Sequence, residues 1–85
     1  MENMYDLDIA LQIIARMEAI KSKEFDVAVT QEDKDNLQRQ IDMLLAEEKA
    51  LYKNDNFRLS VIDKAFRLYA PILKKQSKVE AYEFA

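Results

Sequence analysis

The sequence predicts an all-α fold, an up-down-up bundle of three helices in which a proline kinks the third. Three observations favour this class. The 85 residues include no glycine and one proline, which argues against a turn-rich β fold. Three segments show helical spacing of their apolar residues. The chain is also short enough to form one domain. We therefore expect a single helical domain over 1–85, with helices at about 5–22, 31–53 and 57–76 and a tail at 77–85.

The first helix, over 5–22, carries an unusually large share of apolar residues. Nine of the twelve residues from Ile9 to Ile20 are apolar, and Asp8, Gln12 and Arg16 form one narrow polar stripe at intervals of four. An ordinary surface helix buries an apolar face of roughly 100° and exposes the rest. This helix is therefore either central in the fold, or it packs on its own fold with one side and on a second chain with another.

The second interpretation is preferred, because an 85-residue monomer has little material with which to surround one helix. Leu11, Ile14 and Met17 belong to the core on either interpretation. Other apolar residues lie on a different side of the helix, and they are predicted to contact a second chain and complete the fold as a homodimer. A solitary bundle is the alternative. The predicted contacts between chains are Ile9, Ile13, Ile20 and Phe25.

The second helix, over 31–53, has a clear start and a clear apolar face. The Thr30 hydroxyl is placed to accept a hydrogen bond from the amide of Asp33, and acidic residues fill the first turn, where the helix dipole favours them. Glu48 interrupts the apolar stripe. The stripe consists of Leu37, Ile41, Leu44, Leu45, Leu51 and Tyr52.

The third helix, over 57–76, contains Pro71. Proline has no amide hydrogen to donate to the carbonyl of Arg67, but the apolar period continues on both sides of it, so the sequence predicts a kink and no break. Val61 and Leu68 flank the predicted buried stripe. That stripe consists of Ile62, Ala65, Phe66, Tyr69, Ile72 and Leu73.

Two stretches, 25–29 and 79–84, alternate apolar and polar residues with a period of two. Such a pattern is typical of strands, and the two could pair as a short β ribbon. An isolated two-stranded ribbon is marginal in water. We therefore prefer to interpret 25–29 as an extended linker and 79–84 as part of the tail.

Charge is distributed unevenly along the chain. The 13 basic and 16 acidic residues give a net charge of −3, and the basic residues concentrate in the third helix. These residues are the candidate surface for a nucleic acid or a nucleotide, although pairing with acidic residues of neighbouring helices is the preferred interpretation. The candidate set is Arg58, Lys64, Arg67, Lys74 and Lys75.

The sequence lacks the residues that several kinds of chemistry require. Without cysteine or histidine, there is no thiol nucleophile, no imidazole base and no thiolate or imidazole metal ligand, and without glycine there is no phosphate-binding loop. The acidic residues follow neither the EF-hand pattern nor the Glu-x-x-His pattern of di-iron bundles. We therefore expect no enzymatic activity, no cofactor and no metal site.

The expected function is that of a small interaction or regulatory module, which acts through protein–protein contacts as a homo-oligomer with a further partner of unknown identity. Binding of nucleic acid through the third helix is the alternative. No apolar run approaches 18 residues, and the N-terminus has no basic segment before an apolar one. We therefore expect a cytoplasmic protein without contact to a membrane.

Overall fold

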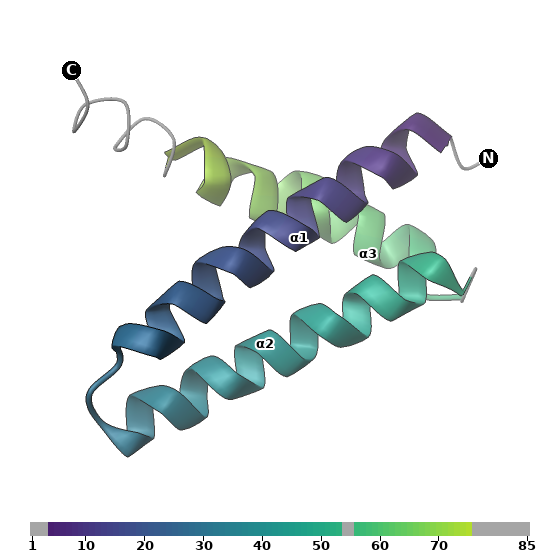
Figure 1. Cartoon of the computed structure of the whole chain (residues 1–85). Helices are drawn as coiled ribbons and strands as arrows, with labels where there is room; N and C mark the ends of the chain where they lie inside the picture. Colours follow the sequence, from purple (N-terminus) through teal and green to yellow (C-terminus); the bar gives the residue numbers. More distant parts are fainter. Residues whose placement is uncertain (1–3, 54–55, 76–85) are drawn as a thin grey trace.

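The computed structural model describes residues 4–53 and 56–75, and all regular structure in these two ranges is helical. Helices α1 (Met4–Val27), α2 (Gln31–Tyr52) and α3 (Arg58–Lys64) are followed by a π-helical turn, η1 (Ala65–Tyr69). Residues 70–75 continue as α-helix, so 58–75 form one uninterrupted helix, called the third helix below. The prediction of an all-α chain with three helices is confirmed (Figure 1).

Helix α1 is longer than expected and ends at Val27 instead of Ser22. The interpretation of 25–29 as extended is therefore wrong for 25–27, and so is a strand there. Phe25 lies about three helical turns beyond Ile14, so extending the helix keeps its ring on the buried side, where it is half-buried. The amide of Ala28 then donates to the carbonyl of Phe25 at 3.2 Å and closes the helix. Residues 79–84, the proposed partner strand, lie outside the described residues.

Helix α2 begins as predicted. Thr30 has extended backbone angles, and its hydroxyl accepts a hydrogen bond from the Asp33 amide at 3.1 Å. This contact satisfies one of the amides that have no partner within the first turn of a helix. At the other end, the amide of Lys53 donates to the carbonyl of Lys49 at 3.0 Å.

A kink is predicted at Pro71, and the structure has a π turn just before it. The amide of Ala70 donates to the carbonyl of Ala65, five residues back, where an α-helix would use the carbonyl four residues back. The wider turn precedes the residue that cannot donate a hydrogen bond and whose ring would crowd the preceding turn.

The π turn also changes which apolar residues are buried. One extra residue in a turn makes each later residue occupy the angular position of its predecessor in an unbroken α-helix. Leu73 therefore reaches the core, whereas Ile72 is 43% exposed. Phe66, within the turn, is also exposed. The prediction that Phe66 and Ile72 are buried is wrong for this reason.

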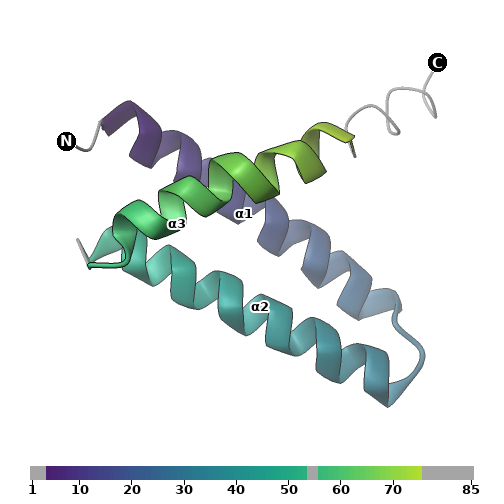
Figure 2. The same ribbon diagram turned by 180° about the vertical axis from the view of Figure 1, so that it is seen from behind.

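The three helices form two layers. α1 and α2 run antiparallel from the connection at 28–30 and diverge away from it, while the third helix crosses one face of α1 near the open end (Figures 1 and 2). The extents of 42 × 34 × 15 Å fit two layers of helices spaced about 8–10 Å apart. The radius of gyration of 14.2 Å exceeds the about 12 Å expected for a compact chain of this length. The arrangement is thus flatter than the side-by-side bundle that was predicted.

The core lies where the third helix crosses α1 and where α1 packs on α2. Helix α1 contacts both other helices and supplies four of the buried apolar residues, so it is the central helix of the fold. Among the described helices, none combines the length and apolarity needed to cross a bilayer. The buried residues are Ala10, Ile13, Ile14, Met17, Leu44, Leu51, Val61, Ile62, Ala65, Tyr69 and Leu73.

Candidate interaction surface

The apolar side of α1 that was predicted to contact a second chain lies against the chain's own third helix at Ile13. Ile13 is only 9% exposed and lies in the core, and a small hollow beside it is lined also by Ala70 and Leu73. Ile9 and Ile20 are half-buried and pack against the same core. At Ile13 the predicted contact between chains is therefore replaced by a contact within one chain.

Phe25, the fourth residue of the predicted interface, is half-buried in the last turn of α1. The spacing of its apolar residues gives α1 two apolar sides. Spacing within one helix does not reveal that the third helix folds back across α1, so it could not show which chain covers the second side.

Exposed apolar side chains gather instead on α2, on the third helix and at Phe57, which precedes the third helix. Within the described part of α1, the exposed large apolar residue is Val27, at the helix end. This distribution is the reverse of the one expected from the sequence. The exposed residues on the other elements are Met43, Leu45 and Tyr52, then Phe57, Leu59, Phe66, Leu68 and Ile72.

An apolar groove runs between α2 and the start of the third helix. On α2 the groove is lined by one helix face, with residues three and four apart, and its volume is about 350 Å³. Phe57, at its edge, is 68% exposed. The residues that line it are Met43, Ala46, Glu47 and Ala50 from α2, together with Phe57, Ser60 and Val61.

The single carboxylate of the groove is held by two donors from the third helix. Glu47 accepts a hydrogen bond from Lys64 Nζ at 2.8 Å and another from the Tyr69 hydroxyl at 2.6 Å. Lys64 Nζ also lies 5.2 Å from the centre of the Tyr69 ring and 3.6 Å from Met43 Sδ. These contacts tie α2 to the third helix and balance the charge of Glu47.

The pKa values of the two donors follow from this arrangement. Burial opposes the charged form of Lys64, but the hydrogen bonds to Glu47 and Tyr69 and the charge of Glu47 outweigh it, and the pKa of Lys64 is raised. Burial, and then the hydrogen bond to Glu47, raise the pKa of Tyr69. Both groups therefore keep their protons at neutral pH, and the three side chains form a neutral set.

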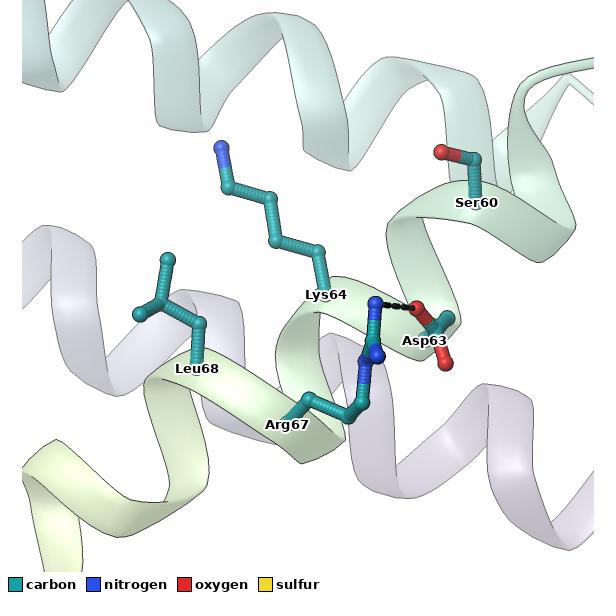
Figure 3. Close-up of a pocket in the computed structure, with 5 residues that line it drawn as sticks. All are labelled: Ser60, Asp63, Lys64, Arg67 and Leu68. Atoms are coloured by element: carbon teal, nitrogen blue, oxygen red, sulfur yellow. Dashed lines mark ion pairs between the residues drawn. The ribbon is translucent and has the colours of Figure 1, made fainter.

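The candidate basic surface is largely engaged in contacts within the chain. Arg58 Nε donates to the carbonyl of Leu51 at 2.9 Å, and Lys64 is bound to Glu47. Arg67 pairs with Asp63 at 3.0 Å on the outer side of the helix, while Lys64 extends toward α2 (Figure 3). Asp63, Lys64 and Arg67 line a hollow of about 550 Å³, together with Ser60 and Leu68.

Lys74 and Lys75 are exposed in the last described turn. The structure thus brings Lys64 and Arg67 to one hollow but gives each a carboxylate within the chain, and it places Lys74 and Lys75 beyond the π turn.

A pair of carboxyl groups lies between α1 and α2. Glu18 of α1 faces Glu48 of α2, and burial, a hydrogen bond with Glu48 and the charge of Glu48 raise the pKa of Glu18 to about 7. Its Oε1 is buried and receives no hydrogen bond from the described residues. The pattern of α2 identifies Glu48 as an interruption of the apolar stripe, but Glu18 was not predicted as a site residue. The indication was there, because Glu18 also lies in an apolar run, away from the polar stripe of α1.

Metal binding finds no support in the described part of the chain, where no three acidic side chains lie together as possible ligands. No protein-family model matches the sequence, and comparison with curated proteins and with solved structures finds no significant match. The function must therefore be argued from the surface itself.

Proposed function

We propose that this protein is a small, non-enzymatic interaction module that pairs with a second copy of itself through the groove between α2 and the third helix. The observation that carries the proposal is the apolar lining of that groove, with the exposed ring of Phe57 at its edge. Interfaces between proteins are enriched in methionine and aromatic residues and poor in unpaired charge.

The state of Glu47 makes this groove suitable for burial. A carboxylate that loses its water without a partner destabilises an interface by several kcal/mol. Here Lys64 and Tyr69 already satisfy Glu47 within the chain. A second chain can therefore cover the groove without supplying a compensating charge.

Charge complementarity supports a second copy as the occupant. Residues 58–75 carry five basic and one acidic side chain, whereas 31–52 carry six acidic and three basic ones. The groove lies at the junction of these segments, so two copies that meet there place a basic helix of each chain near an acidic helix of the other. The basic helix of each copy then attracts the acidic helix of the other.

The shape of the chain supports the same occupant. The two-layer arrangement is only 15 Å thick, and apolar side chains remain exposed on both elements that border the groove. A symmetric dimer uses the same patch on both subunits, so one groove with both apolar and charged neighbours is sufficient to build it.

Two matched substitutions of alanine by arginine test the proposal. Ala46 lies in the groove and Ala19 is exposed on α1, so Ala46→Arg and Ala19→Arg add the same side chain at exposed helical positions. Native mass spectrometry and sedimentation equilibrium should find a dimer for the wild type and for Ala19→Arg, and a monomer for Ala46→Arg. A wild-type chain that stays monomeric at hundreds of micromolar, or dimers in both variants, would overturn the proposal.

The alternative function, binding of nucleic acid through the basic third helix, has less support. Three of its five candidate residues contact a carboxylate or a carbonyl of the same chain, so fewer cations remain to neutralise phosphates.

A further inference from the structure

We propose that Glu18 and Glu48 make the packing of α1 on α2 depend on pH: a proton shared by the two carboxyl groups holds the helices together, and its loss loosens them. The proposal concerns the inside of one chain and is independent of dimerisation. It rests first on position. Glu18 lies next to the buried Met17 and one turn beyond the buried Ile14. Glu48 lies on α2 between the buried Leu44 and Leu51, and these two helices pack on each other.

The orphaned oxygen of Glu18 is the second observation. Two ionised carboxylates cannot hydrogen-bond to each other, because neither has a donor. A protonated Glu18 donates to Glu48 and removes the repulsion at the same time. The buried Oε1 has no donor among the described residues, so no hydrogen bond at that oxygen compensates a charge on Glu18.

The charged groups around the pair do not offset the repulsion. On α1, Lys21 lies one turn beyond Glu18, but it pairs with Glu24 at 3.4 Å. On α2, Glu47 and Lys49 flank Glu48; Glu47 is occupied by Lys64 of the third helix, and Lys49 is exposed. Among the described residues, the charge that acts on Glu18 is that of Glu48, and its effect is to raise the pKa.

The direction of the pH dependence follows from the raised pKa. The pKa of Glu18 is about 7 in the folded chain, against 4.5 when no neighbour acts on it. Between these values the folded chain holds a proton that the unfolded chain has released, so stability falls as the pH rises through this window. The stabilisation by the shared proton is fully present below about pH 4.5 and is lost above about pH 7.

Two measurements test the inference. In ¹³C NMR of the wild-type protein, the Glu18 carboxyl should titrate with a midpoint near 7, whereas a midpoint near 4.5 would overturn the proposal. In thermal unfolding at one protein concentration, the wild type should lose several degrees of Tm between pH 5.5 and pH 8.5. Glu18→Gln should remove most of this loss.

Asp8→Asn removes a carboxylate at an exposed position of the same helix; it is the matched control and should keep the wild-type pH dependence. Glu48→Gln provides a second variant, because it also removes the repulsion, and it replaces Glu18→Gln if that protein does not fold. If both variants lose Tm with pH as steeply as the wild type does, the pair is not the source of the pH dependence.

Discussion

Helix α1 and the third helix differ in how their sequences relate to their surfaces. α1 is the more apolar of the two, yet its exposed large apolar residue in the described range is Val27, at the very end. The third helix is basic and less apolar, yet it exposes Leu59, Leu68 and Ile72. The difference teaches that the exposed apolar surface depends on the number of neighbours a helix has. α1 is covered by α2 on one side and by the third helix on another, whereas the third helix forms the second layer alone and is covered on one side only.

The strongest test of this comparison truncates one isoleucine in each helix. Ile14→Ala removes a fully buried side chain of α1 and should cost about 2–5 kcal/mol of unfolding free energy. Ile72→Ala, at a position 43% exposed, should cost much less, about 0.5 kcal/mol. Urea denaturation followed by circular dichroism measures both. Equal losses would mean that the third helix is buried as deeply as α1, for example by a second chain.

The contact between α2 and the third helix should give an effect of intermediate size. Glu47→Ala leaves the buried hydroxyl of Tyr69 without an acceptor and should cost about 1–3 kcal/mol. Glu47→Gln keeps an oxygen for that hydroxyl and should cost less.

A double-mutant cycle isolates the hydrogen bond. In the Tyr69→Phe background the cost of Glu47→Ala should fall, because the orphaned hydroxyl is gone. Unchanged costs in both backgrounds would show that Tyr69 and Glu47 do not interact in solution.

The smallest effect is expected on the outer side of the third helix. Arg67 and Asp63 form an ion pair whose side chains are mostly in water, and Arg67→Ala should cost about 0.5 kcal/mol or less. Lys64→Ala should cost more, because its partner Glu47 is half-buried and the ion pair is shielded. Thermal unfolding of the two variants compares them directly, and a larger loss for Arg67→Ala would contradict this order.

The structural features that could be predicted from the sequence are those that residues close together in the chain determine. The cap at Thr30 depends on a side chain and an amide three residues apart, and both are visible in the sequence. The absence of a break at Pro71 could also be predicted, because the apolar period continues on both sides of it.

What could not be predicted depends on contacts between distant segments. The alternation around Phe25 favoured an extended chain, and only packing on the buried side of α1 selects the helix. Nothing local brings Glu18 opposite Glu48, or Lys64 and Tyr69 to Glu47. The path of the third helix across α1 decides whether Ile13 meets its own chain or another.

The π turn at Ala65–Tyr69 also means that the third helix can lose one residue without changing the faces it presents. An insertion or deletion of one residue in a regular helix rotates everything beyond it by about 100°. Deleting one residue within this turn would instead remove the extra residue that makes the turn wide, and the residues beyond it would keep their angular positions. Leu73 would stay against the core and Ile72 would stay exposed. A single codon thus separates a π turn from a regular α-helix with the same outer face.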